Sequence, residues 1–478
     1  MDLHIDLKRR RDRAGQIYRG VRAAILDGRL RRGDRLPPTR EMAQRLEVSR
    51  NTVAAAYEWL IAEGLVSGQA GAGSFVQGEP PPASPRRRAK AGALLQSRAL
   101  WRELPGPRER LGPSAYDFRA GMPDAQLFPF ETWRRFSARQ LRAAVLSAEY
   151  GEPAGHPTLR AAVARHIGLA RGVQADAEDV IITHGAQQAF DLIGRVLIDP
   201  GTCVVVEEPG YPPPGLLFQS LGARVVRVPV DAEGLDVSAL PSEARLVYVT
   251  PSHQFPLGVA MSPARRTALL AWAEQRNAVV IEDDYDSEFR FGGRPLETLH
   301  SLDRSGRVIY VGSFSKVMLP ALRLGYLVAP PALQPALRAA KHLSDWHCQW
   351  PEQAALARFI DEGQLARHIR KMRREYEARH ERIHHTLLRD FDPWLEPVPS
   401  VAGLHLSATF KDTSAKLERE VVARAKVAGV GLHPLSGFYA HRPARPGLVL
   451  GYGAIATHRI DEGLRRLRAS LSAVTRGA

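Results

Sequence analysis

Apolar residues recur with helical spacing along the first 76 residues, interrupted by short polar turns. The segment 16–27 carries one apolar helical face, and Gly28 follows where a C-terminal cap is expected. Thr39 is placed to cap a short second helix, and Ser49 to cap a third helix after a tight turn. The pattern predicts a helix-turn-helix whose third helix presents its first turn to solvent.

Two short apolar runs, at 65–67 and 74–76, flank the glycine-rich stretch GQAGAG. This spacing predicts two strands joined by a turn, which would form a wing beside the helices. Gly71 and Gly73, in the turn, are candidate DNA-contact positions. Residues 10–77 are therefore assigned to a winged helix-turn-helix domain that is all-α apart from its wing.

Polar residues open the third helix, where backbone amides and side chains could meet phosphates and base edges in a DNA major groove. The candidates there are Ser49, Arg50, Asn51 and Thr52. Arg40, at the start of the second helix, could contact the flanking DNA backbone. A three-helix interaction module with solvated arginines would show the same periodicity, so the helical pattern alone leaves both interpretations open.

The stretch 78–115 is rich in proline, arginine, alanine and glycine and has no apolar period, which predicts an extended or flexible linker. Beyond it, short β-branched runs alternate with longer helical patterns. This alternation predicts an α/β domain with a mostly parallel sheet. The runs are 180–182, 203–206, 225–228, 246–249, 279–281 and 308–311.

The C-terminal domain is assigned to residues 116–478. Its large part is expected at about 150–350, where the strand runs lie. Amphipathic helices mixed with a few strands predict a small α+β lobe at about 353–478.

Charge and cysteine content narrow the possible functions. The formal net charge of +15 and a pI of about 10.1 favour a polyanionic partner, because basic surfaces attract phosphate backbones. Cys203 and Cys348 provide neither a disulfide framework nor metal-ligand spacing, which fits a reducing cytoplasm without a metal site. The N-terminus is charged and no apolar run spans a bilayer, so neither secretion nor a membrane partner is expected.

A lysine follows the last strand run in a setting that favours a phosphorylated ligand. Lys316 ends the motif GSFSK, and Arg323 lies seven residues further on. A lysine amine at a strand end can react with an aldehyde cofactor when a desolvated site lowers its pKa. Ser313, Ser315 and Arg323 offer hydroxyls and a guanidinium to a phosphate ester. Most lysines are solvated, so the prediction depends on further partners.

Upstream segments supply those partners. Asp283 and Tyr285, in EDDYDSEF, could hold a protonated pyridine nitrogen and the ring 3-oxygen. Tyr211 could stack on the ring, although a buried core tyrosine would fit the same position. Ala186 and Gln187 open a helix after a strand, where they could cradle the phosphate. Because cofactor sites in such sheets lie at the carboxyl ends of strands, these segments are predicted to converge.

Residues 16–76 resemble the winged-helix domains of the GntR superfamily in the wording LPPTREMAQRLEVSRNTVAAAYEWLIAEGL followed by GAGSFV. The resemblance implies DNA contacts from Arg40 and Arg50, with Asn51 and Thr52 beside them. It favours DNA binding over the interaction module.

Residues from about 117 to 470 resemble the fold type I aminotransferases in the order and spacing of the candidate cofactor residues. DFRAGMPD, YGEPAGHPTLR, EEPGYP, TPSHQFPLG and EDDYDSEF, behind a GntR-like head, look like the MocR/GabR subfamily of regulators. That resemblance implies pyridoxal 5'-phosphate bound as an internal aldimine. The implied roles fall on a covalent lysine, three ring contacts and three phosphate contacts: Lys316; Asp283, Tyr285 and Tyr211; Ser313, Ser315 and Arg323.

One departure from the aminotransferase pattern lies beside the expected ring. Phe255 stands where many aminotransferases have an asparagine. This leaves open whether His253 or Gln254 contacts the ring.

Two further departures concern the ligand. Val449 aligns where a transaminase would hold its substrate's α-carboxylate with an arginine, and Arg442 and Arg445 are nearby candidates that could equally be solvated. Pro213 stands where family members that sense γ-aminobutyrate are expected to have an arginine. That ligand is therefore not favoured.

The combined interpretation is a cytoplasmic transcriptional regulator that binds double-stranded operator DNA and senses pyridoxal phosphate, or a small amine or amino acid that reacts with it. The resemblance implies a homodimer, arranged head to tail, that reads half-sites separated by whole helical turns. The aminotransferase-like domain is expected to serve for sensing, with a residual half-reaction left open. The alternative is a working aminotransferase with a vestigial DNA-binding head.

Overall fold

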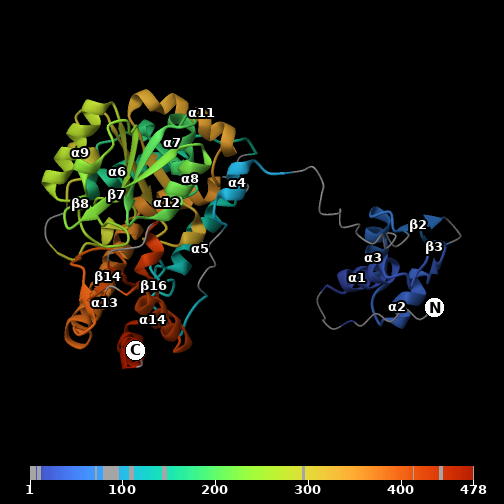
Figure 1. Cartoon of the computed structure of the whole chain (residues 1–478). Helices are drawn as coiled ribbons and strands as arrows, with labels where there is room; N and C mark the ends of the chain where they lie inside the picture. The colour runs from blue at the N-terminus through green and yellow to red at the C-terminus, as the bar shows by residue number, and fades with distance from the viewer. Residues whose placement is uncertain are drawn as a thin grey trace. The chain divides into compact units, whose positions relative to one another are not determined.

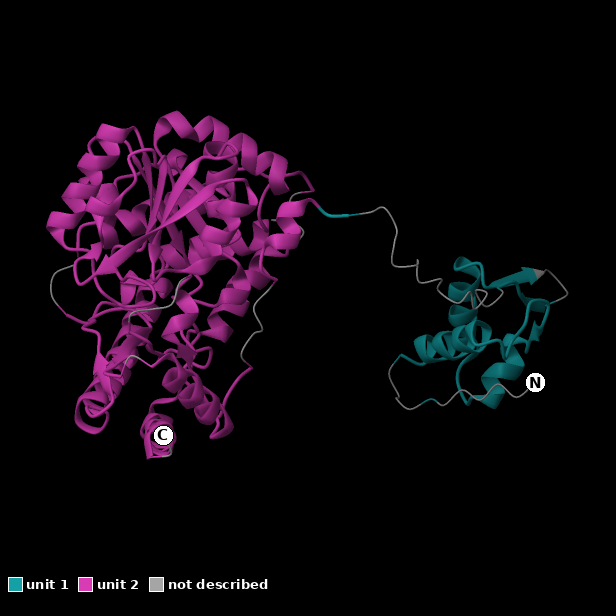
Figure 2. Ribbon diagram, viewed as in Figure 1, with its two compact units in different colours: residues 1–97 teal, residues 98–478 magenta. Residues whose placement is uncertain are grey.

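The computed structural model describes residues 7, 12–69, 73–78, 96–106, 112–142, 148–292, 296–412, 414–440 and 445–476. The chain divides into two compact units, residues 1–97 and 98–478 (Figure 1, Figure 2). Within the described parts of both units, no helix has the length and apolar composition needed to cross a membrane.

Unit 1 is a winged helix-turn-helix, which confirms the predicted fold. Its elements are α1 (Arg13–Leu26), β1 (Arg35–Leu36), α2 (Thr39–Arg45), α3 (Arg50–Ala62), β2 (Val66–Gln69) and β3 (Gly73–Val76). The strands form an antiparallel sheet in the order β1-β3-β2, and β2 and β3 make the wing. Gly71, predicted in the wing turn, lies outside the described residues.

The apolar faces of the helices in unit 1 meet in one core. Ile17 of α1 and Val53 and Leu60 of α3 are fully buried. The Tyr57 hydroxyl donates a hydrogen bond of 2.9 Å to the Pro37 carbonyl oxygen, which ties α3 to the segment before α2. The core thereby holds the first turn of α3 in place at the surface.

Two predicted helix starts differ from the structure. Helix α1 begins at Arg13, earlier than predicted, because the Asp12 carboxylate caps it. Thr39 is the first residue of α2, whereas Pro38 occupies the cap position without a side-chain bond. Ser49 does cap α3, since its hydroxyl accepts from the Thr52 amide at 3.2 Å.

Unit 2 contains an eight-stranded sheet in the order β5-β12-β11-β10-β9-β6-β7-β8. The strands are β5 (Val180–Thr183), β6 (Cys203–Glu208), β7 (Arg224–Asp231), β8 (Gly234–Leu235), β9 (Leu246–Val249), β10 (Val279–Asp284), β11 (Val308–Ser313) and β12 (Gly325–Val328). Every predicted run is a strand. β12 was not predicted, and it pairs antiparallel with both β11 and β5, so the sheet is mixed.

Both faces of the sheet are buried at its central strands, which explains their unbroken apolar runs. Val280 and Ile281 are adjacent in β10, point to opposite faces and are both fully buried. Helices α7 (Ala186–Leu197), α8 (Pro212–Ser220) and α11 (Gln334–Asp345) contribute to the core on one face. Helices α6 (Pro157–Arg171), α9 (Pro263–Arg276) and α12 (Trp350–Asp361) contribute to the cores on the other. Short α10 (Leu299–Leu302) packs near α9.

A small lobe follows α12, as predicted. Its elements are α13 (Gln364–Asp390), β13 (Leu395–Pro397), β14 (His405–Phe410), α14 (Ala415–Val427), β15 (Val430–Gly431), β16 (His433–Pro434), β17 (Gly447–Gly451) and α15 (Ile460–Arg476). Four of the strands form a sheet in the order β13-β14-β17-β16. Figure 1 shows α13, α14 and the C-terminus below the large sheet.

The start of unit 2 corrects the predicted linker. Helix α4 (Ala99–Glu103) lies inside the stretch predicted to be extended, and unit 2 begins at Arg98. Strand β4 (Tyr116–Asp117) then pairs with β15 of the small lobe, and α5 (Phe130–Gln140) packs on α12. Strand β4, near the start of unit 2, is therefore paired with the small lobe.

Replacing Ser49 tests the cap that orients α3. Ser49→Ala should destabilise the start of α3 by about 1 kcal/mol, because the Thr52 amide loses its acceptor. In the full chain, hydrogen exchange of amides in α3 should then be about fivefold faster. Ser49→Asp, which restores an acceptor, should return the exchange toward the wild-type rate. Equal rates in Ser49→Ala and the wild type would contradict this account.

Candidate cofactor site and DNA-binding surface

Lys316 follows β11 and lies at the carboxyl end of the sheet. Its Nζ donates a hydrogen bond of 2.7 Å to the carbonyl oxygen of Gly121, which comes from the segment after β4. Burial lowers the pKa of Lys316, whereas the charges of Asp286 and Asp283 act in the opposite direction. A lowered pKa makes the unprotonated, nucleophilic amine more accessible near neutral pH.

Asp283 offers a buried carboxylate with one oxygen unused. Its Oδ2 accepts a hydrogen bond of 2.6 Å from the Tyr248 hydroxyl of β9, while its Oδ1 is buried and has no hydrogen-bond partner among the described residues. Burial raises the pKa of Asp283 to about 7, although the Tyr248 hydroxyl lowers it. An unpaired buried carboxylate oxygen is a suitable partner for a protonated ring nitrogen.

The other end of the site has the features of a phosphate cradle. Helix α7 begins at Ala186 after Gly185, which has a φ of 75° and provides no side-chain cap. The Arg323 Nη2 donates to the His184 carbonyl oxygen at 2.5 Å. A Cβ on Gly185 would lie 3.0 Å from the Arg323 guanidinium. A bare helix N-terminus beside a guanidinium attracts a phosphate.

The remaining predicted phosphate contacts lie on nearby segments. Ser313 ends β11, and its Oγ accepts from the Ser315 amide at 3.1 Å. Both serines are partly exposed, as is Ala186, whereas Gln187 is exposed. The structure therefore places hydroxyls at the lysine loop and amides at the start of α7, on the two sides of β12.

Aromatic side chains line the region beside Lys316 and Asp283. Tyr211 precedes α8, and its ring meets that of Phe255 edge to face at 5.6 Å between centroids. The Phe255 ring also meets Tyr285 at 6.3 Å. The Tyr285 hydroxyl donates to the His253 carbonyl oxygen at 3.0 Å.

Gln254 and His253, the two candidates for a ring contact beside Phe255, both bond to protein groups. The Gln254 amide donates to the carbonyl oxygens of Pro209 and Phe255, both at 2.8 Å. The His253 Nδ1 lies 3.1 Å from both oxygens of Asp286. Both side chains are buried and engaged with protein groups, so Phe255 is the member of this trio that faces Tyr211.

The positions considered for binding a substrate carboxylate differ in burial and in their partners. Val449 is fully buried in β17, opposite Ser407 of β14. Arg445 is exposed and forms an ion pair of 2.9 Å with Glu396. Arg442 lies outside the described residues. Pro213 lies in the first turn of α8, as its place after Tyr211 requires.

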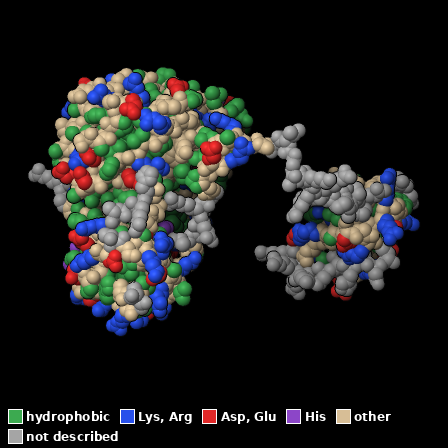
Figure 3. All heavy atoms as spheres, viewed as in Figure 1, with side chains coloured by type: hydrophobic (Ala, Val, Ile, Leu, Met, Phe, Trp, Pro, Cys, Tyr) green, Lys and Arg blue, Asp and Glu red, His purple; other side chains and the backbone are tan. Residues whose placement is uncertain are grey.

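The predicted DNA-binding residues gather at the start of α2 and α3. Arg40, Arg50 and Asn51 are exposed. Ser49 and Thr52 are partly committed to the cap, since their hydroxyl oxygens lie 2.8 Å apart. The visible face of unit 1 carries arginine side chains (Figure 3).

Strand β1, which pairs with the wing, contributes a cation that the sequence reasoning missed. Gly73, at the start of β3, has a φ of 115°, and a Cβ there would lie 3.0 Å from the Arg35 Nε. Arg35 belongs to β1, which pairs with β3. The antiparallel pairing of β1 with the wing was the missing signal, because a two-residue strand has no recognisable sequence pattern.

Comparison with known proteins identifies both units. Residues 13–76 match the family model of bacterial regulatory proteins of the gntR family, and residues 116–431 match aminotransferase class I and II. A probable rhizopine catabolism regulatory protein, MocR, of Rhizobium meliloti is 40% identical over 96% of this chain and 94% of its own length. The chain belongs to the MocR-type regulators.

Two other relatives agree. The pyridoxine biosynthesis transcriptional regulator PdxR of Corynebacterium glutamicum is 32% identical over 92% of this chain and 91% of its own length. The crystal structure of α-aminoadipate aminotransferase from Thermus thermophilus, complexed with N-(5'-phosphopyridoxyl)-L-leucine, is 32% identical with a TM-score of 0.69 and covers 76% of this chain and 93% of its own. The C-terminal fold is thus of fold type I, and the cofactor of this MocR-type chain is pyridoxal phosphate, as predicted.

Several residues at the site were absent from the sequence prediction. The Tyr248 hydroxyl bonds Asp283, and the Gly121 carbonyl oxygen accepts a hydrogen bond from Lys316. The parallel pairing of β9 with β10 brings Tyr248 opposite Ile281. Such register depends on the assembled sheet and has no local signal.

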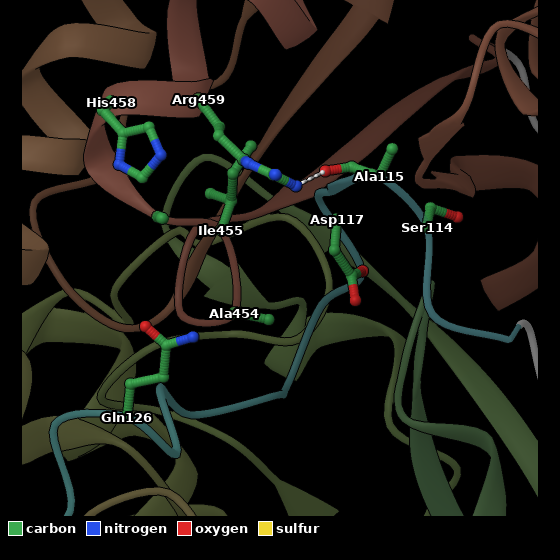
Figure 4. A pocket seen from close by; sticks show the side chains of 9 residues that line it. Ser114, Ala115, Asp117, Gln126, Ala454, Ile455, His458 and Arg459 are labelled. Atoms are coloured by element: carbon green, nitrogen blue, oxygen red, sulfur yellow. Dashed lines mark hydrogen bonds between the residues drawn. The ribbon is translucent and has the colours of Figure 1, made fainter.

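A surface pocket of about 370 Å³ lies elsewhere in unit 2 (Figure 4). It is lined by Ser114, Ala115, Asp117, Gln126, Ala454, Ile455, Ala456, His458 and Arg459. The Arg459 Nη1 donates to the Ala115 carbonyl oxygen at 3.0 Å, drawn as a dashed line in Figure 4, and the Asp117 carboxylate is paired with Arg119 at 2.6 Å. The pocket shares no lining residue with the predicted cofactor site.

Removing the Tyr248 hydroxyl tests the tuning of Asp283. Tyr248→Phe should raise the pKa of Asp283 further, because the hydroxyl stabilises the charged carboxylate. We expect the affinity for pyridoxal phosphate, measured by absorbance titration at neutral pH, to fall about tenfold. Tyr310→Phe is a matched control, since the Tyr310 hydroxyl bonds Asp284 at the same distance of 2.6 Å. Equal losses in the two variants would contradict a specific role of Tyr248.

Proposed function

We propose that this MocR-type regulator binds operator DNA through unit 1 and holds pyridoxal phosphate at Lys316 in unit 2. The observation that carries the proposal is the buried, unpaired Oδ1 of Asp283 near a lysine whose pKa is lowered by burial. That combination meets the needs of an aldehyde-bearing pyridine ring, and it is joined in one chain to a winged helix.

Each predicted site residue has a role in this proposal. Lys316 would hold the aldehyde carbon, and Asp283 would keep the ring nitrogen protonated. Tyr285 would contact the ring 3-oxygen, and Tyr211 would cover the ring. The phosphate is assigned to Ser313, Ser315, Arg323, Ala186 and Gln187. When bound, the cofactor supplies an aldehyde carbon open to amines and an electron-withdrawing ring.

The effector is proposed to be pyridoxal phosphate itself or a small amine or amino acid. An amine that takes the place of the Lys316 amine on the aldehyde carbon frees that side chain. The freed Lys316 loses its position beside the ring, which provides the difference in contacts that a ligand-driven switch requires. The names of two relatives, a rhizopine catabolism regulator and a pyridoxine biosynthesis regulator, support amine catabolism and vitamin B6 synthesis as the two classes of target gene.

The assembly is proposed to be a cytoplasmic homodimer in which the head of one chain lies near the body of the other. Such a dimer would carry two winged helices. Its operator should then contain two half-sites separated by whole turns of DNA.

The alternative function, a working aminotransferase, is not favoured. Relatives that match nearly the whole chain are named as regulators, whereas the aminotransferases match about three quarters of it. The buried Val449, at the position aligned with the carboxylate arginine, also argues against tight binding of an amino-acid substrate at that point.

The Lys316→Ala variant separates sensing from DNA binding. It should lose the absorbance band of bound pyridoxal phosphate and the cofactor dependence of DNA binding, while its DNA affinity stays close to that of the wild type. The assay is fluorescence anisotropy at fixed salt on DNA upstream of its own and neighbouring genes, with nonspecific competitor.

Lys411→Ala is the control for that variant, because Lys411 is a surface residue paired with Asp392. It should keep both the band and the response. Weak binding of the wild type to every fragment, abolished by salt and unchanged by cofactor, would overturn the proposed function.

The Arg50→Ala variant tests the assigned DNA surface. Loss of a side chain that meets the DNA should reduce operator affinity about tenfold or more. Arg29→Ala is the control, because Arg29 is an exposed arginine of the same unit that is paired with Asp27 at 2.7 Å. An unchanged Arg50→Ala affinity, or equal losses in both variants, would remove α3 from the interface.

A further inference from the structure

His253 joins the cofactor region to the small lobe through both nitrogens of its ring. On one side, Nδ1 lies 3.1 Å from both carboxylate oxygens of Asp286 and 3.1 Å from the Tyr285 hydroxyl. On the other, Nε2 lies 3.3 Å from the Ser400 Oγ. Ser400 belongs to the segment that leads from β13 to β14.

The carboxylate determines how the ring is protonated. Asp286 and His253 are both about 99% buried as side chains, and a buried carboxylate next to a ring nitrogen requires a proton between them. Nδ1 is therefore a donor toward Asp286, and Nε2 faces the Ser400 hydroxyl, which also lies 3.5 Å from the Ala402 carbonyl oxygen. The orientation of His253 is thus set jointly by the large sheet and by the small lobe.

Two backbone hydrogen bonds also join the segment after β10 to the segment between β13 and β14. The Phe291 amide donates to the Val401 carbonyl oxygen at 2.8 Å, and the Gly403 amide donates to the Phe289 carbonyl oxygen at 2.9 Å. Gly403 has a φ of 81°, and a Cβ there would overlap the His253 Cε1. The junction is therefore built so closely around the imidazole that only glycine fits opposite it.

The contact with Tyr285 has two mutually exclusive forms. The hydroxyl donates to the His253 carbonyl oxygen at 3.0 Å. Burial raises the pKa of Tyr285, so the phenol keeps its single proton. If that proton is given to the cofactor, the bond to the carbonyl oxygen is lost. The single Nδ1 proton of His253, which lies at the same distance of 3.1 Å from the Asp286 oxygens and from the phenol oxygen, can then be shared between the carboxylate and the phenol.

We propose that His253 is a positioning residue of the cofactor site, which holds the Tyr285 phenol through Nδ1 and is itself held by Ser400 of the small lobe. The inference rests on the proposed function, because it assigns Tyr285 to the cofactor's 3-oxygen. His253 would therefore strengthen the phenol as a donor and link it to the position of the small lobe.

Other titratable groups face His253 from the elements packed around it. Asp286 and Tyr285 come from the segment after β10, His405 comes from β14 with ring centroids 4.7 Å apart, and His380 comes from α13. Of these groups, the variants that follow alter only Asp286 and Tyr285, and they leave His405 and His380 unchanged.

Two substitutions at His253 test the contacts of Nδ1 and of Nε2 separately. Asparagine places an amide near the position of Nδ1, and glutamine places one near Nε2. His253→Gln should weaken the phenol as a donor, leave the cofactor's oxygen more basic, and raise the pH midpoint of the cofactor absorbance band by about one unit. His253→Asn should leave that midpoint near the wild-type value.

In hydrogen exchange, His253→Asn should differ from the wild type and His253→Gln should not. The amides of Phe291 and Gly403 should exchange several-fold faster in His253→Asn and in Ser400→Ala, which both lose the contact to the small lobe. They should exchange near the wild-type rate in His253→Gln. Ser400→Ala should keep the wild-type midpoint, which a general loosening of the fold would not produce.

A double variant keeps the test decisive. Because His253 acts through Tyr285, His253→Gln should add no further shift when Tyr285 is already phenylalanine. Asp286→Asn provides a second route if His253→Gln does not fold, and it should raise the midpoint in the same direction. Midpoints equal to the wild type in both His253→Gln and Asp286→Asn, or shifts that add to that of Tyr285→Phe, would overturn the inference. Absence of a cofactor band in the wild type would instead overturn the proposed function.

Discussion

A carboxylate kept out of water at the end of β10 is the constraint on which the proposed cofactor site depends. Asp283 has one oxygen bonded by the Tyr248 hydroxyl and the other buried without a partner among the described residues. An ionised carboxylate in such a place is costly until a cation or a donor meets it. Because β9, β10 and β11 are parallel neighbours, their carboxyl ends bring Tyr248, Asp283 and Lys316 to one edge of the sheet. The sheet thus creates a place for a protonated ring beside a reactive amine.

The antiparallel strand β12 shapes the opposite end of the site. It begins at Gly325 between β5 and β11, and a Cβ there would lie 2.7 Å from the Gly185 Cα and 3.1 Å from the Gly312 carbonyl oxygen. Three glycines therefore let three backbones approach closely. Arg323, just before β12, turns with a φ of 50° and reaches the His184 carbonyl oxygen. The strand that makes the sheet mixed is also the one that delivers the guanidinium to the start of α7.

How much the sequence predicts depends on whether the information is local. The strand runs were recognisable because both faces of the sheet are buried, as Val280 and Ile281 show. The site motifs were recognisable because each follows such a run. β4 has only two residues, and β12 opens with a glycine and has Val328 as its one β-branched residue, so neither shows the β-branched run that marks the recognised strands. The register of β9 with β10 brings Tyr248 to Asp283, and the tertiary fold brings Gly121 to Lys316, which is 195 residues further along the chain. No single segment of the sequence encodes either contact.

The chain's path through the small lobe gives a physical reason for joining a sensor to a DNA-binding unit. The linker reaches unit 2, and β4 then pairs with β15 of the small lobe. Arg459 holds the Ala115 carbonyl oxygen just before β4. A few residues after β4, the Gly121 carbonyl oxygen accepts a hydrogen bond from the Lys316 Nζ. The segment that enters from the linker is therefore bonded both to the small lobe and to the reactive lysine. The bond to Gly121 is made by the free Lys316 amine, so attachment of Lys316 to the cofactor would withdraw this donor from the segment that β4 pairs with the small lobe.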